Sequence, residues 1–155
     1  MSSIVGTEYC KLDSNNRFKL PISIKKEMGN SDCRYVIRQC VHEPCLELWT
    51  YEGFQKELDF LRQKINSYSK KGMRVMRRLA AGTTVEMDSN DRMVIPNEHR
   101  GVLKGSKELI LQSMARYVEI WDRDTYYLVN QDSDELSQEI DEFMEGLIDG
   151  IEDRP

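Results

Sequence analysis

Two nine-residue segments of the sequence carry the same charged residues at the same spacing. DSNNRFKLP begins at Asp13 and DSNDRMVIP begins at Asp88, and an arginine, Arg17 or Arg92, follows each aspartate by four residues. An arginine in a turn can bind the O6 and N7 atoms of guanine through two hydrogen bonds. An aspartate in the same turn can accept hydrogen bonds from the local backbone, form an ion pair, or take part in acid–base chemistry.

Catalysis by the two aspartates is the least favoured of these chemistries. In an aspartic-protease dyad two carboxylates share one proton, and a small third residue, normally glycine, lets the two loops approach. Here Asn15 and Asn90 occupy that place. The arginine two residues further on would also lower the pKa of each carboxyl group. We therefore expect the aspartates to hold the turns, through an ion pair with the arginine or as backbone caps.

The cysteines and histidines give little support to a metal or catalytic site. Cys40, His42 and Cys45 lie close together, but the Cys-x4-Cys spacing is unusual for a metal site and no second cluster follows. Neither His42 nor His99 has a nucleophile motif nearby, and the sequence has no glycine-rich phosphate loop. We predict no catalytic residue, metal or cofactor and no small-molecule substrate, and we expect the four cysteines to be reduced, buried thiols.

The two segments belong to a longer internal repeat. At an offset of 75 residues five identities coincide within nine positions. Further along, at an offset of 72 residues, CLELW, ending at Trp49, matches YVEIW, ending at Trp121. Each unit reads as strand, tight turn, short strand, short helix after a proline, and two further strands. The predicted ranges are 8–12, 18–20, 22–28, 35–40 and 46–49 in the first unit, and 83–87, 93–95, 97–103, 108–112 and 118–121 in the second.

Helical segments are predicted outside the two units. An apolar stripe at helical spacing is formed by Phe54, Leu58, Leu61, Ile65 and Tyr68, and another by Leu136, Ile140, Phe143 and Leu147. The segment 69–81 is rich in lysine and arginine. We expect these stripes to pack in the core. The predicted organisation is a first half at 4–50, a helical insert at 51–82, a second half at 83–122 and an acidic helical tail at 123–155.

The charge of the chain is unevenly distributed. Its 155 residues include 27 acids and 22 bases, giving a net charge of −5, and the composition is that of a globular domain with 39% hydrophobic residues. Residues 132–155 hold ten acids and one base, so the body carries about +4 and can accept a polyanionic partner. No apolar run reaches the roughly 20 residues needed to span a bilayer, and the N-terminus does not resemble a secretion signal.

The repeated motifs resemble those of the MraZ family. The segments LDSNNRFKLP and MDSNDRMVIP look like its paired Asp-x-x-x-Arg signatures, and EPCLELW, RVMRRLAAGT and YVEIWD are similar to the family as well, over about residues 4–128. The resemblance implies an α+β, mainly β fold, a duplicated AbrB-like barrel of the swapped-hairpin type closed by two halves of one chain. It also implies ring-shaped homo-oligomers that bind short G-rich direct repeats in double-stranded DNA, usually to repress the bacterial division and cell-wall gene cluster.

The resemblance also implies roles for individual residues. It places the family's DNA-contacting arginines at Arg17 and Arg92. The family commonly reads Asp-x-Lys-Gly-Arg in the first motif, whereas Asn15 and Asn16 stand here in place of Lys-Gly, which removes one contact to phosphate or base. The first loop has more nearby bases and is expected to make most of the contact. The DNA-binding set is Arg17, Arg92, Asn15, Lys11, Lys19 and Lys25, and the loop-positioning residues are Asp13 and Asp88.

The sequence thus predicts a cytoplasmic, nucleoid-associated DNA-binding regulator without enzymatic activity. Two alternatives assign the function to the acidic tail. In one the protein is an interaction scaffold that acts through its C-terminal helix. In the other the tail competes with DNA for the basic body, because an acidic segment can imitate a polyanion.

Overall fold

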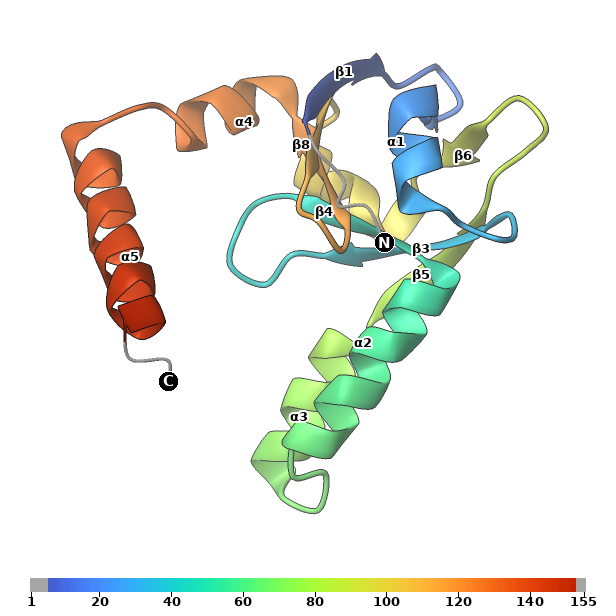
Figure 1. Ribbon diagram of the computed structural model, residues 1–155. Coiled ribbons are helices and arrows are strands. Elements are labelled where there is room, and N and C mark those ends of the chain that lie inside the picture. The colour runs from blue at the N-terminus through green and yellow to red at the C-terminus, as the bar shows by residue number, and fades with distance from the viewer. Residues whose placement is uncertain (1–5, 153–155) are drawn as a thin grey trace.

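The computed structural model describes residues 6–152, which form two repeated units, a helical hairpin between them and two C-terminal helices (Figure 1). The first unit comprises β1 (Thr7–Lys11), β2 (Arg17–Lys19), α1 (Ile22–Met28), β3 (Arg34–Gln39) and β4 (Leu46–Thr50). The second comprises β5 (Gly82–Glu86), β6 (Arg92–Val94), η1 (Asn97–Leu103), β7 (Glu108–Ser113) and β8 (Val118–Asp122). The helices outside the units are α2 (Tyr51–Lys64), α3 (Lys70–Leu79), α4 (Arg123–Val129) and α5 (Asp134–Glu152).

The two units are interwoven in one antiparallel sheet. Its strand order is β1-β7-β8-β4-β3-β5, so the first strand of each unit pairs with the third strand of the other. The corresponding strands are β1 and β5, β3 and β7, and β4 and β8. If each pair is exchanged, the strand order is the same when read from the other edge of the sheet. The centre of this symmetry is the β4–β8 pair, where Glu47 lies opposite Glu119.

The short strands β2 and β6 form a separate antiparallel ribbon. Arg17 pairs with Val94 and Lys19 pairs with Arg92. The ribbon is tied to the preceding loops, because Leu20 N–H donates to Asp91 O and Ile95 N–H donates to Asn16 O at 2.9 and 2.8 Å. Each unit thus holds the loop of the other, and the two loops lie side by side.

The α+β class is confirmed, whereas the closed barrel that was predicted is not found in residues 6–152. The hydrogen-bonded order of the sheet has two ends, β1 and β5, because each of these strands pairs along one edge only. The strands that would have to continue around a barrel, β2 and β6, are only three residues long and pair with each other.

Alternation along the strands gives the sheet two buried faces. Leu46 and Leu48 of β4 point into the main core, where they join Phe18 of β2 and Ile95, which follows β6. Trp49 points to the other face of the sheet and packs with Phe54 and Leu58 of α2. The main core also contains Leu20, Ile24, Tyr35, Ile37, Met93, Leu103, Leu109, Leu111, Val118 and Ile120. Burial of both faces explains why the strands are rich in apolar residues at consecutive positions.

The short helices end alike in the two units but differ in type. Gly29 closes α1 with φ of 61°, and Lys104 occupies the corresponding left-handed position after η1 with φ of 56°. The prediction of a helix at 97–103 is confirmed in position, but this segment is a 3₁₀ helix. Gly101 lies within it, and glycine has a low propensity for the interior of an α-helix.

The helical insert and the C-terminal helix behave differently. In the insert, α2 packs on the sheet through Phe54 and Leu58, and Figure 1 shows the tip of the α2–α3 hairpin projecting away from the end of the molecule that holds the β2–β6 ribbon. In α5, every side chain of 134–148 except Leu136 is exposed. The prediction that the stripe of α5 packs in the core is wrong for the single chain, since Phe143 is 77% exposed. It is also wrong for Tyr68 of the insert, which lies beyond the end of α2 and is exposed.

The structure also bears on two other predictions, which concern membrane-spanning helices and the state of the cysteines. Among the described residues, no helix has the length and apolar character needed to cross a membrane. All four cysteines lie in the described part and form no disulfide, but only Cys45 is buried; Cys10 and Cys40 are half-buried and Cys33 is exposed. The prediction of uniformly buried thiols is therefore wrong, because Cys33 lies in the exposed turn before β3 rather than in a strand.

Candidate nucleic-acid interface

The two Asp-x-x-x-Arg loops have the same backbone structure. In the first loop Asp13 N–H donates to Arg17 O at 2.8 Å and Asn16 N–H donates to Asp13 O at 3.0 Å. The second loop repeats both bonds, from Asp88 to Arg92 and from Asp91 to Asp88, at 2.9 and 3.1 Å. Asn16 and Asp91 have φ of 58° and 61°, a left-handed conformation that asparagine and aspartate tolerate better than most residues.

Each aspartate side chain fixes its own loop. Asp13 Oδ1 accepts the backbone N–H groups of Asn15 and Arg17 at 2.8 and 3.0 Å. Asp88 Oδ1 accepts those of Asn90 and Arg92 at the same two distances. Both aspartates therefore cap the turn and orient the backbone from which the arginine side chain projects.

The second oxygen of each aspartate pairs with the arginine of the other loop. Arg17 Nη1 lies 3.2 Å from Asp88 Oδ2, and Arg92 Nη1 lies 3.6 Å from Asp13 Oδ2. The sequence suggested ion pairs within each motif, and the structure places them between the motifs. The reason is the β2–β6 register, which sets the two loops next to each other. The arginine side chains remain 48% and 42% exposed.

Both carboxyl groups stay charged well below neutral pH. The backbone N–H of Arg17 is the main cause that lowers the pKa of Asp13, and the N–H of Arg92 does the same for Asp88. The positive charges of both arginines lower the pKa of each carboxyl further. Two carboxyl groups lowered in this way, each bound to an arginine, do not share a proton as a catalytic dyad does.

The predicted basic residues do not all lie around the first loop. Lys11 and Lys19 are exposed next to it in β1 and β2, and Asn15 is exposed at its tip, where only its backbone N–H is engaged. Lys25 instead reaches the second loop, where its Nζ lies 2.6 Å from Asp91 Oδ1. That contact neutralises an acid of the second loop and leaves less of the Lys25 charge for a phosphate.

One basic residue near the first loop was missed by the sequence reasoning. Lys107, which precedes β7, donates from Nζ to Asn16 Oδ1 at 3.5 Å, and its carbonyl accepts Leu12 N–H at 2.8 Å. It comes from the other unit, 91 residues away. Only the exchange of strands between units brings it there, and nothing in the local pattern around Lys107 indicates this.

The cysteine cluster considered in the sequence also takes a different form. Cys40 and Cys45 approach each other, and the third residue that joins them is Glu119 of β8, whereas His42 is exposed on the intervening loop. Burial raises the pKa of the Cys45 thiol and of the Glu119 carboxyl. Glu119 could not be connected with the cysteines from sequence spacing, because β4 and β8 belong to different units.

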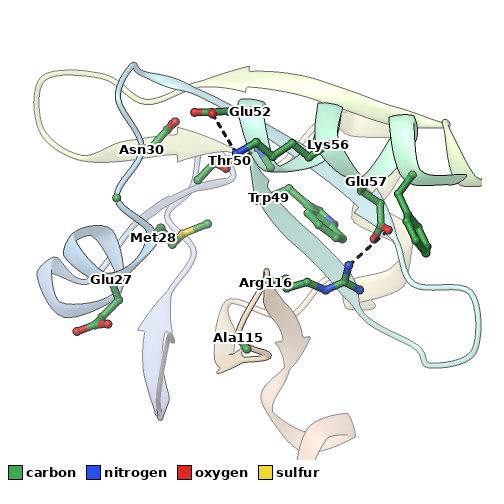
Figure 2. A pocket seen from close by; sticks show the side chains of 13 residues that line it. Glu27, Met28, Asn30, Trp49, Thr50, Glu52, Lys56, Glu57, Ala115 and Arg116 are labelled. Atoms are coloured by element: carbon green, nitrogen blue, oxygen red, sulfur yellow. Dashed lines mark hydrogen bonds and ion pairs between the residues drawn. The ribbon is translucent and has the colours of Figure 1, made fainter. Parts of the chain in front are cut away.

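A cavity of about 440 Å³ lies elsewhere, between the end of α1, the start of α2 and the β7–β8 turn (Figure 2). Trp49 and Phe60 line it, and its rim holds two ion pairs, Arg116 with Glu57 and Lys56 with Glu52, at 3.5 and 3.2 Å. Its lining contains no cysteine or histidine. The acidic, basic and aromatic side chains of this cavity do not form a nucleophile with a base next to it.

Comparison with known proteins supports the resemblance of the motifs. A family model described as "MraZ protein, putative antitoxin-like" matches residues 79–145. Proteins named Transcriptional regulator MraZ from Christiangramia forsetii and Flavobacterium psychrophilum are 35% and 36% identical to the chain, cover 86% of it in both cases, and are themselves covered over 86% and 85%. A protein of the same name from Cytophaga hutchinsonii is 29% identical over 93% of the chain. Together with the paired loops, these similarities show that the chain belongs to the MraZ family.

Proposed function

We propose that this protein is a transcriptional regulator that binds double-stranded DNA at short G-rich direct repeats and represses the division and cell-wall gene cluster. The printed names of its relatives, Transcriptional regulator MraZ, support regulation of transcription. The cavity and the paired loops do not place a nucleophile beside a base, which fits the proposed role without catalysis. We place the protein in the cytoplasm, associated with the nucleoid.

The observation that carries the proposal is the pair of exposed arginines held on rigid loops by each other's aspartates. An exposed ion pair stabilises a protein by about 0–1 kcal/mol. A bidentate contact between arginine and guanine discriminates by about 1–3 kcal/mol. Breaking such an ion pair therefore costs little when an arginine moves to a guanine edge, and in the free protein the ion pairs hold both arginine side chains in place.

The first loop is proposed to make the larger contribution to DNA binding. Lys11, Lys19 and Lys107 surround it with positive charge suited to phosphates. The second loop contains Asp91 and lies next to Glu86, and within residues 6–152 Lys25 is the cation that forms an ion pair with Asp91. We therefore assign base recognition mainly to Arg17 and Asn15, with Arg92 in a supporting role and Asp13 and Asp88 positioning the loops.

A single chain presents only one such pair of loops, so recognition of tandem repeats needs several copies. We propose that residues 4–50 and 83–122 are two AbrB-like halves of one DNA-binding unit, linked by the insert 51–82 and followed by the tail 123–155. Copies of this unit are proposed to form a ring. Several weak contacts at regular spacing then gain affinity from effective concentration.

The helices α3 and α5 have the complementary surfaces that such an assembly requires. The exposed face of α3 carries four bases and no acid, flanked by Met73 and Val75. By contrast, α5 has eight acids, no base and an exposed apolar stripe with Phe143 and Leu147. We propose that α5 of one copy docks on α3 of the next. A contact between two different surfaces of the same chain is heterologous, and such contacts form a ring where the rotation between copies closes.

The exposed stripe of α5 also favours a second candidate function, an oligomeric scaffold that acts through the acidic helix. If that function is correct, the loops that carry Arg17 and Arg92 have no DNA partner. The two functions differ in one property, since only a DNA-binding regulator distinguishes a repeat sequence from its scrambled form.

The proposal is tested by fluorescence anisotropy with duplexes that carry tandem G-rich repeats or scrambled repeats, over a salt series. We expect specific binding that weakens with salt and that falls about 10- to 100-fold in Arg17→Ala, the equivalent of one bidentate contact. The matched control is Arg62→Ala on α2, because Arg62 is also exposed and ion-paired, 3.1 Å from Asp59, but lies in the hairpin remote from the loops.

Equal affinity for both duplexes would contradict sequence-specific recognition, and absence of binding at low salt would favour the scaffold. An equal loss of affinity in Arg17→Ala and Arg62→Ala would show that only total charge matters. Arg92→Ala should lose less affinity than Arg17→Ala; the reverse order would assign the main contact to the second loop.

A further inference from the structure

Two buried glutamates meet at the centre of the sheet, where the repeated units join. Glu47 of β4 and Glu119 of β8 are register partners, and both are more than nine-tenths buried. Each accepts a hydrogen bond from the indole N–H of the tryptophan two residues later, Trp49 at 3.0 Å and Trp121 at 3.1 Å. The two glutamates therefore occupy equivalent sites in the repeat and can be compared directly.

The two sites differ in their charge partner. Glu47 Oε1 is bound by the Arg38 guanidinium at 2.7 and 2.9 Å, and Arg38 is its register partner in β3. The register partner of Glu119 is Gln112 in β7, whose amide oxygen accepts the hydroxyl groups of Thr7 and Tyr126 instead. No described lysine or arginine forms an ion pair with Glu119, and a buried carboxylate without a cation is costly.

Two cysteines stand where the cation is missing. The Sγ atom of Cys45 lies 3.7 Å from Glu119 Oε2. Cys40 lies next to Cys45, because Cys40 N–H donates to Cys45 O across the β3–β4 hairpin. The two Sγ atoms and a carboxylate oxygen of Glu119 all lie within 4.8 Å of one another. The cluster therefore gathers three metal-ligand side chains from two units at one point.

We propose that Cys40, Cys45 and Glu119 bind one thiophilic divalent cation, with Zn²⁺ as the best fit and a water molecule as the fourth ligand. Zinc binds sulfur at about 2.3 Å and carboxylate oxygen at about 2.0 Å, so tetrahedral geometry sets the sulfur–oxygen separation near 3.5 Å. The Cys45–Glu119 separation of 3.7 Å is close to that value. The ion would supply at Glu119 the positive charge that Arg38 supplies at Glu47.

The site has a route of entry and a structural consequence. Cys40 is half-buried and is followed by the exposed residues 41–44, so an ion can approach from the hairpin side. Trp121 N–H, bound to the other carboxylate oxygen, would orient the ligand as outer-shell groups do in metal sites. A bound ion would tie the β3–β4 hairpin of the first unit to β8 of the second, and so stabilise the folded chain.

The test uses the full chain, reduced and stripped of metal with a chelator, titrated with Co²⁺ and then with Zn²⁺. We expect one Co²⁺ per chain, a thiolate-to-cobalt charge-transfer band, displacement of that band by Zn²⁺, and a higher melting temperature with Zn²⁺. Cys40→Ser and Glu119→Gln should each weaken Co²⁺ binding by more than about tenfold, since even outer-shell changes reach that size. Cys33→Ser, which changes an exposed cysteine outside the cluster, should bind as the unmodified chain does.

Cys40→Ser is chosen over Cys45→Ser because Cys40 is partly exposed and its change disturbs the core less; the melting curve of each metal-free variant checks that it folds. A folded chain that binds no Co²⁺ through thiolate would overturn the proposal. So would a charge-transfer band that survives both Cys40→Ser and Glu119→Gln, or one that is lost in Cys33→Ser.

Discussion

At the scale of single residues, the first loop differs from the family pattern in a way that the structure makes interpretable. Asn16 stands where the family commonly has glycine, and its φ of 58° explains why glycine suits the position and why asparagine is an acceptable substitute. Asn15 stands where the family has lysine, and its side chain is exposed and holds no part of the turn. The two replacements therefore keep the loop shape and remove one positive charge.

Restoring that charge should strengthen DNA binding. Asn15→Lys is expected to tighten binding at low salt and to make the salt dependence steeper by about one phosphate contact, because the added ammonium group displaces one more counterion. The measurement is anisotropy against salt concentration. Asn90→Lys is the matched control, since Asn90 has the same backbone role in the second loop. Equal gains in both variants would contradict the dominance of the first loop.

A second residue-scale prediction concerns the buried ion pair at Glu47. Arg38→Gln imitates the Gln112 found at the equivalent position of the other unit, but it leaves Glu47 buried without its cation. We expect a loss of about 3–5 kcal/mol in the free energy of unfolding, measured by urea denaturation at fixed protein concentration. Arg38→Gln combined with Glu47→Gln should recover much of the loss. A single-variant loss below about 1 kcal/mol would show that Glu47 needs no charge partner.

At the scale of elements, the shape of the α2–α3 hairpin depends on one glycine. A Cβ atom at Gly72 would lie 1.7 Å from the backbone oxygen of Asn66 and 2.9 Å from Ser69 Oγ, which caps α3 by accepting Gly72 N–H. The hairpin turn can accommodate such an atom only by opening. The sequence pattern predicted a helical insert, but it gave no reason for a glycine at this place.

Gly72→Ala should therefore destabilise the chain by about 1–3 kcal/mol, the range found for overpacked sites. Gly146→Ala in α5 is the control, because nothing lies within 4 Å of its Cβ position and alanine favours a helix interior by up to about 1 kcal/mol. Thermal and urea denaturation of the two variants would be compared. Equal stability of the two variants would mean that the turn is looser than the structure indicates.

The elements also show what sequence reasoning can and cannot reach. The repeat, the turns and most strands follow from local residue types, and β1 and β5 agree with the predicted ranges to within one residue. The exchange of strands between units depends on contacts between residues at least 44 positions apart, as for Arg38 and Gly82. The ion pairs from Arg17 to Asp88 and from Arg92 to Asp13, and the contact of Glu119 with Cys45, join residues more than 70 positions apart. Local periodicity contains no information on such register.

At the scale of the whole molecule, the acidic C-terminal helix α5 is separated in space from the basic body of the chain. Figure 1 shows α5 standing apart from the sheet beyond α4, and its described side chains are almost all exposed. In a single chain the acidic helix therefore does not cover the loops that carry Arg17 and Arg92. This arrangement disfavours direct competition between the tail and DNA within one chain, and it leaves the apolar stripe of α5 available to another copy.

The two roles of the tail predict opposite effects of its removal. If α5 docks on α3 of a neighbouring copy, deletion of residues 132–155 should lower the oligomer mass and weaken binding to tandem repeats, while affinity for a single repeat stays unchanged, because only the gain from effective concentration is lost. If the tail competes with DNA, deletion should tighten binding to both duplexes at low salt. Light scattering coupled to size exclusion and anisotropy with one-repeat and multi-repeat duplexes distinguish these results.

Point variants separate the apolar face of α5 from its charge. Phe143→Ser with Leu147→Ser removes the stripe and keeps every acid, so docking predicts loss of assembly and competition predicts no change. Glu142→Gln with Glu145→Gln keeps the stripe and removes two charges. Docking then predicts assembly that is weaker but less sensitive to salt, since the electrostatic part is screened and the apolar part is not. Retention of full assembly in the serine variant would exclude α5 as the contact between copies.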